Sequence, residues 1–220
     1  MSTPEENNYK NYLDRLEKFI NENKNSLLII GGSIVLLGAL YFSYQQFYLA
    51  PRAIEAKNQM YQAERYFEMD SLDKAINGDG NFEGFLAIAD EYSGTKAANL
   101  ANYYLGISYL KKGEFEKAIE SLKNFKSSDI VISSMAKGAI GDAYTELGDF
   151  DNASSFYKKA SGDKSNTYTA PIYLMKLGMS LEQQKKSEDA FKVYKKIKEE
   201  YPESTQARDI DKYIGRTELN

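Results

Sequence analysis

Residues 77–81 read Asn-Gly-Asp-Gly-Asn, so oxygen-bearing side chains alternate with glycines at a spacing that suits calcium ligands. An EF-hand loop beginning at Asn77 would need glycine at its sixth position and glutamate at its twelfth. The chain has Phe82 and Ile88 at these two positions. We therefore interpret the segment as a turn that ends a helix, and the sequence predicts no metal site.

The chain of 220 residues contains neither histidine nor cysteine. Their absence removes the commonest general base, the usual zinc ligands, thiol nucleophiles and disulfides. The many carboxylates lie next to lysines, as in segments 114–117 and 195–200, which is more typical of solvated helix faces than of acid–base pairs. The formal net charge of −4 argues against nucleic acid as the main partner. We predict a protein that is not an enzyme, with no catalytic residues and no cofactor.

One sequence pattern occurs three times, and it predicts the helices that would position any functional side chain. It reads Leu-Gly-x-x-Tyr at 105–109, Ile-Gly-x-x-Tyr at 140–144 and, in degraded form, Leu-Gly-x-x-Leu at 177–181. An alanine follows each glycine by twelve residues, at Ala118, Ala153 and Ala190. A period near 34 residues with these landmarks is typical of tetratricopeptide repeats (TPRs).

The chain therefore resembles the TPR family over residues 96–203, and the resemblance implies an all-α solenoid of helical hairpins. The repeated glycines and alanines let the two helices of a hairpin approach closely. Gly113 and Gly148 follow a first helix, where glycine readily adopts a left-handed conformation. Such stacks bind partners far more often than they transform them.

We expect five segments along the chain. Phe85-x-x-Ile88-x-x-x-Tyr92 repeats the spacing of Tyr194-x-x-Ile197-x-x-x-Tyr201, which predicts an incomplete hairpin over residues 56–93. Ser204 and the apolar stripe after it predict a helix that caps the stack. The segments are an amphipathic cytoplasmic tail (1–25), a transmembrane helix (26–50), a linker helix and divergent leading hairpin (51–93), three TPR repeats (94–203), and a C-terminal capping helix and tail (204–220).

The segment from 25 to 51 contains no charged residue, and about 20 apolar residues suffice to cross a bilayer core. A cleaved signal peptide fits poorly, because a largely polar segment of 24 residues precedes the apolar run and no small-residue cleavage site follows it. A core helix of a soluble domain would show a polar stripe. We predict a retained anchor in which residues 26–50 contact membrane lipid.

The tail before the anchor has its own pattern. Thr3-Pro4-Glu5-Glu6 is a typical helix start, with proline in the first turn. Apolar side chains then recur at helical spacing. Either this helix lies at the membrane interface or docks a membrane partner, or it is an extension of the anchor with an incidental stripe. The stripe comprises Tyr9, Tyr12, Leu13, Leu16 and Ile20.

In TPR stacks the first helix of each pair lines the concave face, which implies a partner-binding groove here. Tyr103 and Ile107 stand where the carboxylate-clamp TPRs have Lys and Asn, so recognition of an EEVD-type C-terminus is not expected. The same residues could instead face the leading hairpin or the cap and form core. The residues at groove positions are Leu100, Tyr103, Ile107 and Leu110; Met135, Gly138, Asp142 and Thr145; and Ile172, Met175, Met179 and Glu182.

Residues 84–104, read with the anchor, resemble the bacterial YfgM-like TPR proteins of the Bacteroidota type. The resemblance implies an accessory subunit of a SecYEG-type translocon that works beside a membrane-anchored chaperone (PpiD) on newly exported, nascent chains. It also implies a single-pass protein of the bacterial inner membrane, with a cytoplasmic N-terminus and a periplasmic domain.

The charges close to the anchor do not decide this orientation, because three basic residues on one side (Arg15, Lys18 and Lys24) are matched by three on the other (Arg52, Lys57 and Arg65). Two alternatives stay open: a cytosol-facing TPR receptor, and an envelope-assembly adaptor for cell division or outer-membrane insertion.

Overall fold

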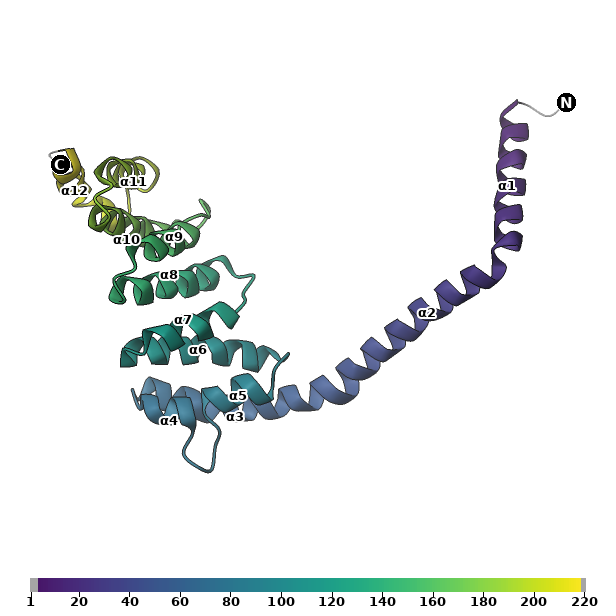
Figure 1. Ribbon diagram of the computed structural model, residues 1–220, viewed down its shortest axis with the longest axis horizontal. Helices are drawn as coiled ribbons and strands as arrows, with labels where there is room; N and C mark the ends of the chain where they lie inside the picture. The colour runs from purple at the N-terminus through teal and green to yellow at the C-terminus, as the bar shows by residue number, and fades with distance from the viewer. Residues whose placement is uncertain (1–3, 219–220) are drawn as a thin grey trace. The chain divides into compact units, whose positions relative to one another are not determined.

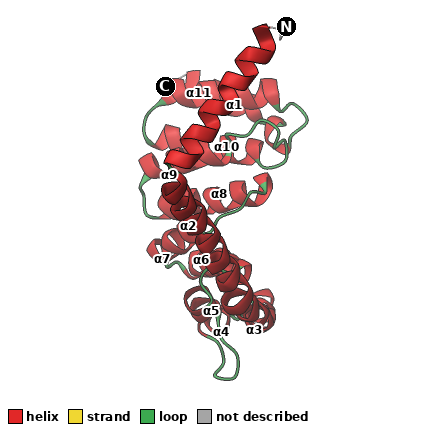
Figure 2. Ribbon diagram, turned by 90° about the vertical axis from the view of Figure 1, so that its right-hand side faces the viewer, coloured by secondary structure: helices red, strands yellow, loops and turns green. Residues whose placement is uncertain are grey.

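The computed structural model describes residues 4–218, with side chains described for Tyr9 and for residues 12–217, and each regular element in this range is a helix (Figures 1 and 2). The all-α solenoid expected from the sequence is confirmed. The chain divides into two compact units, Met1–Pro51 and Arg52–Asn220. Thr3, which we expected to begin the first helix, lies outside the described residues.

The first unit contains helices α1 (Pro4–Glu22) and α2 (Lys24–Ser43). Helix α2 begins a helical stretch of 45 residues, Lys24–Glu68, which by length and composition is long and apolar enough to cross a membrane. None of the side chains of α2 is buried by the described part of the chain. The apolar stripe of α1 is likewise exposed, with Tyr9 at 67 % and Ile20 at 52 %. Exposed apolar surface of this extent is typical of segments that contact a membrane or another protein.

A π-helix, η1 (Tyr44–Leu49), interrupts the α-helical hydrogen bonding just before Pro51. The Ala50 N–H donates to the carbonyl of Gln45, five residues earlier instead of four. A proline inside a helix has no N–H, and its ring collides with the carbonyl four residues before it. The wider π turn therefore carries the helix past Pro51 without ending it.

The second unit is a stack of helices whose neighbours in sequence lie side by side (Figure 1). Three antiparallel pairs occupy the region where the sequence predicted three hairpins. The leading region, expected to hold a linker helix and a divergent hairpin over 51–93, contains three helices. The helices are α3 (Ala50–Glu68), α4 (Leu72–Asn77), α5 (Phe85–Glu91), the pairs α6 (Lys96–Lys112) with α7 (Phe115–Asn124), α8 (Ile130–Glu146) with α9 (Phe150–Ala160), and α10 (Ala170–Gln183) with α11 (Ser187–Glu200), then α12 (Ile210–Glu218).

The repeated glycines are the points of closest approach within each pair. A Cβ atom on Gly106 would lie 2.4 Å from the Leu122 side chain, and a Cβ on Gly178 would lie 2.2 Å from the ring of Tyr194. The alanine of each repeat is fully buried, as at Ala118. After the first helices of two pairs the chain turns through glycines with positive φ, as at Gly113 with φ +77°. The landmarks that revealed the repeats therefore have direct packing roles.

The leading region shares a core with the first repeat. Phe85 is fully buried, and its ring stacks on that of Tyr104, with 5.1 Å between the centroids. Phe67 of α3 meets both rings edge-on. Phe85 also has the spacing to Ile88 and Tyr92 that Tyr194 has to Ile197 and Tyr201, and Tyr194 is fully buried too. Helix α5 thus acts as the second helix of a leading repeat.

The other end of the stack is covered by α12. The sequence suggested that Ser204 begins this helix. Ser204 instead caps a short 3₁₀ turn by accepting a hydrogen bond from the Ala207 N–H. Ile210 opens α12 and is buried against the last pair at 1 % exposure. Arg216 reaches back to Glu182 of α10, with 2.9 Å between Nε and Oε1. The apolar face of α11 is therefore closed by α12.

The segment 77–81 is a turn that ends α4, as the sequence predicted. Gly78 follows the helix with φ +84°. Asp79 Oδ1 accepts hydrogen bonds from the backbone N–H groups of Asn81 and Phe82, at 2.9 and 2.8 Å. The Tyr66 hydroxyl donates to the other carboxylate oxygen at 2.5 Å. The Asp79 carboxylate thus fastens the turn to α3.

These hydrogen bonds, that of Tyr66 first, lower the pKa of Asp79 from 3.8 to about 2. The stabilisation they provide is present above pH 3.8 and is lost as the pH falls through about 2. We expect the full-length protein to melt at a higher temperature than Asp79→Asn at pH 5, with this difference shrinking steadily towards pH 2. Thermal unfolding of both proteins between pH 2 and pH 5 measures this difference in melting temperature. A difference that does not change with pH would contradict the stabilising role of the Asp79 carboxylate.

Candidate functional site

A groove of about 680 Å³ runs across the first helices of the three pairs. It collects side chains from α6, α8 and α10, and its remaining wall comes from α7 and α9. Its size lies within the range of ordinary ligand pockets. We call it the Asp142 groove and define it by its lining residues: Leu110, Phe115, Asp142, Thr145, Glu146, Phe150, Tyr157, Lys176, Met179, Ser180 and Gln183.

Four of the residues expected at groove positions line this cavity: Leu110, Asp142, Thr145 and Met179. The structure therefore brings together one expected residue from α6, two from α8 and one from α10.

The other expected residues lie elsewhere. Leu100 and Met135 are exposed at 37 % and 40 % but do not line the cavity. Tyr103 and Ile107 pack, half-buried, against the core around Ile140. The remaining four are placed as follows: Ile172 is half-buried, Met175 packs against the core of the last pair, Gly138 is buried where a Cβ would collide with Tyr173, and Glu182 pairs with Arg216 of α12. Some of the expected groove residues therefore line the cavity, and others belong to the core.

An ion pair lies at the centre of the groove. Lys176 Nζ is 2.6 and 2.8 Å from the two carboxylate oxygens of Asp142. The Tyr157 hydroxyl donates to Asp142 Oδ1 at 2.7 Å and lies 3.0 Å from Thr145 Oγ1. The ammonium group also lies about 6 Å from the rings of Tyr157 and Tyr173, within reach of a weak cation–π attraction. The lysine is therefore held by partners from two neighbouring repeats.

The tyrosines of this site stay protonated. Burial, and then the charge of Asp142, raise the pKa of Tyr173 to about 12. Burial raises the pKa of Tyr157 even further, although the Thr145 hydroxyl opposes this shift. Neither phenol is therefore available as a base or nucleophile near neutral pH. Within the described part of the chain, no three acidic side chains are grouped to hold a metal ion. The arrangement suits binding rather than chemistry.

The sequence analysis did not identify Lys176 or the phenylalanines of the groove as site residues, although the repeat period could have indicated them. Lys176 and Asp142 are 34 residues apart, one repeat length. Phe115 and Phe150, the two phenylalanines of the groove, begin α7 and α9 and so occupy equivalent places in their repeats. A search for charged pairs and aromatic residues at this separation would have selected the site.

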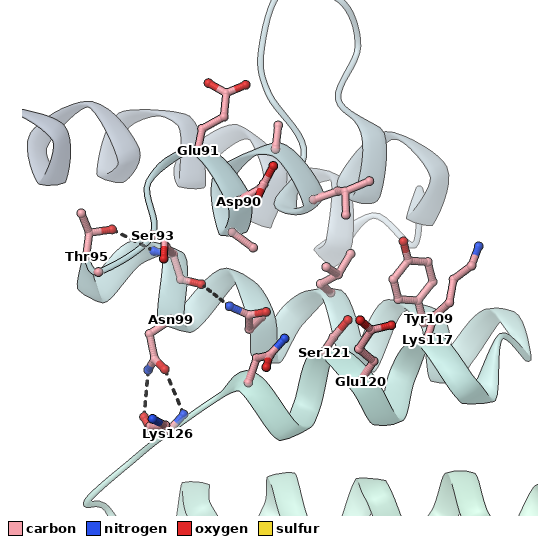
Figure 3. A pocket seen from close by; sticks show the side chains of 18 of the residues that line it. Asp90, Glu91, Ser93, Thr95, Asn99, Tyr109, Lys117, Glu120, Ser121 and Lys126 are labelled. Atoms are coloured by element: carbon pink, nitrogen blue, oxygen red, sulfur yellow. Dashed lines mark hydrogen bonds between the residues drawn. The ribbon is translucent and has the colours of Figure 1, made fainter.

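A larger cleft of about 1200 Å³ lies over α6 between α5 and α7 (Figure 3). Two of its polar side chains already serve the fold. Asn99 exchanges two hydrogen bonds with the backbone of Lys126, at 2.8 and 2.9 Å. Thr95 caps α6 by accepting a hydrogen bond from the Ala98 N–H. We therefore regard the smaller, more apolar Asp142 groove as the better candidate.

Comparison with protein families assigns the stack. A tetratricopeptide repeat model matches residues 100–129 and 173–204, and a second tetratricopeptide repeat model matches residues 136–162. No curated protein matches the chain. The matched segments cover the three helix pairs that form the Asp142 groove. Domains of this kind are typically non-catalytic. The chain thus contains tetratricopeptide repeats over these segments, and such repeats support a role as a scaffold for protein–protein interaction.

Proposed function

We propose that the protein is a membrane-anchored, non-catalytic scaffold that binds a partner protein through the Asp142 groove. The observation that carries the proposal is an open groove with apolar walls on a TPR stack whose chain also contains a membrane-length apolar helix. Such a combination holds a binding surface close to a membrane, where membrane-associated partners and proteins in transit can meet it.

The anchor is supported by the exposed apolar surface of α2. Ten Leu, Ile, Val or Phe residues lie between Leu27 and Phe42. At the usual values for insertion, they favour the bilayer by about 3–6 kcal/mol before glycines and Ser33 subtract. Tyr41 and Tyr48 then provide aromatic side chains for one interface. In this proposal residues 26–50 cross the membrane, residues 1–25 stay in the cytoplasm, and the TPR domain lies in the periplasm.

The partner we propose is a SecYEG-type translocon, with a membrane-anchored, PpiD-like chaperone beside it. Support comes from the resemblance of residues 84–104 to YfgM-like proteins and from the Met179 side of the groove, because methionine adapts to varied apolar segments. The protein would act as an accessory subunit that helps newly exported chains leave the channel.

Two methionines of equal exposure provide a matched test. Met179 lies in the groove and Met135 outside it, and both are 40 % exposed on first helices. We expect Met179→Glu to reduce recovery of translocon subunits by about tenfold in a mild-detergent pull-down of the full-length protein, because it places a charge against apolar contacts. Met135→Glu should retain recovery within about twofold.

Two outcomes contradict the proposal. If neither translocon subunits nor a periplasmic chaperone is enriched over a variant lacking residues 52–220, the translocon assignment fails. If Met135→Glu and Met179→Glu lose the partner equally, the groove is not the binding surface. Protease treatment of intact spheroplasts tests the orientation: cleavage of the TPR domain only from the cytosolic side would favour a cytosol-facing receptor.

A further inference from the structure

We infer that the Asp142 groove binds an apolar segment flanked by a basic residue, and that Asp142 sets this preference by cancelling the charge of Lys176. The inference rests on the groove being the partner site proposed above, and it names the chemistry of the segment bound there. It concerns the sign of charge that the groove accepts.

The walls of the groove determine that the bound segment is mainly apolar. Leu110, Phe115, Phe150 and Met179 surround the cavity. They come from four different helices, so the apolar surface extends across the repeats. A volume of about 680 Å³ accommodates several side chains of a partner segment.

The groove contains more negative than positive charge. Lys176 is its one cation, and Asp142 holds this lysine with both carboxylate oxygens. Glu146 lies one helical turn beyond Asp142 on α8, is exposed, and has no ion-pair partner among the described side chains. The groove therefore keeps one uncompensated negative charge. The second unit has the same sign, with 24 Lys and Arg against 27 Asp and Glu in residues 52–220.

The geometry of the ion pair explains why an acidic flank is excluded. The Tyr157 hydroxyl bonds to Asp142 and fixes the carboxylate where it meets the ammonium group of Lys176. A carboxylate on the partner would approach a lysine that is already neutralised, with Asp142 and Glu146 repelling it. A basic side chain would instead meet the free carboxylate of Glu146. Without Asp142, the same Lys176 would become a carboxylate-binding site.

Two peptides with the same Leu- and Phe-rich core test the preference. Both are acetylated and amidated, and one ends in two lysines and the other in two glutamates. We expect the full-length protein in detergent to bind the lysine peptide about fivefold more tightly by fluorescence anisotropy at low salt. The preference should disappear at 1 M salt, where charges are screened within about 3 Å.

Charge-removing variants locate the determinant. Asp142→Asn keeps an oxygen that can accept from Tyr157 but releases Lys176, and Glu146→Gln removes the free carboxylate. We expect the double variant to prefer the glutamate peptide. Glu116→Gln removes an exposed carboxylate of α7 outside the groove and should keep the wild-type preference. Unchanged melting temperatures verify that each variant is folded.

The results separate this inference from the proposed function. Equal binding of the two peptides, binding of neither, or an equal effect of Glu116→Gln and the double variant overturns the inference. If the pull-down still depends on Met179 in those cases, the scaffold function stands with a different type of segment. If the pull-down is insensitive to Met179→Glu, the groove fails as the partner site and the inference fails with it.

Discussion

Replacing Phe85 by alanine is expected to lower the free energy of unfolding of the helical stack by about 4 kcal/mol. Phe85 is fully buried, stacks on Tyr104 and lies edge-on to Phe67. Its removal leaves a cavity between α3, α5 and α6, and that cavity can collapse only by moving whole helices. The loss of aromatic contacts adds to the loss of apolar burial.

Urea unfolding of the full-length protein in detergent, followed by far-UV circular dichroism, measures this effect. Phe82→Ala is the control, because Phe82 lies three residues earlier and is 47 % exposed, so its removal should change stability by less than about 0.5 kcal/mol. If Phe85→Ala is no more destabilising than Phe82→Ala, the leading helices do not belong to the cooperative core.

The second large effect is expected at Gly178. Gly178→Ala should lower the free energy of unfolding by about 2 kcal/mol and the melting temperature by about 4–8 °C. The added Cβ would lie 2.2 Å from the ring of Tyr194, which is fully buried and has no room to withdraw. Helices α10 and α11 must therefore separate. The better helix propensity of alanine, about 1 kcal/mol, offsets only part of this strain.

Gly215→Ala separates the effect of steric strain from the effect of helix propensity. A Cβ on Gly215 meets nothing within 4 Å, so Gly215→Ala retains only the gain in helix propensity and should raise stability by about 0.5 kcal/mol. Differential scanning calorimetry of both variants checks the opposite signs. A neutral or stabilising Gly178→Ala would show that α10 and α11 do not approach as closely as described.

The repeats could be predicted from the sequence because each landmark has one local packing role. Gly106 and Gly178 mark close helix contacts, and these contacts depend only on residues within the same hairpin. The leading region was less predictable. Its division into three helices depends on Gly78, with φ +84°, and on Gly84, where a Cβ would lie 2.3 Å from the Ile76 carbonyl oxygen. These contacts within a loop leave no periodic pattern.

The candidate groove was predictable in part. Position within the repeat brought Asp142 and Met179 to the cavity, but other residues expected in the groove, such as Tyr103, are covered by neighbouring aromatic rings, including Phe125 at 5.2 Å. The pairing of Lys176 depends on side-chain conformations that the repeat pattern does not determine. Periodicity therefore indicated which helices form the surface, and tertiary packing decided which side chains remain accessible.

The closure of the stack by α12 has a consequence for how copies of the protein can assemble. A repeat array with an open last face presents the same kind of apolar surface that each repeat uses to receive the next one. Here Ile210 and the Arg216–Glu182 ion pair hold α12 over that face. At the other end α3, α4 and α5 cover the first pair. Neither end of the described stack therefore exposes the apolar face that copies would need to join end to end into a filament. Contacts between copies through the sides of the described stack are therefore favoured over end-to-end contacts.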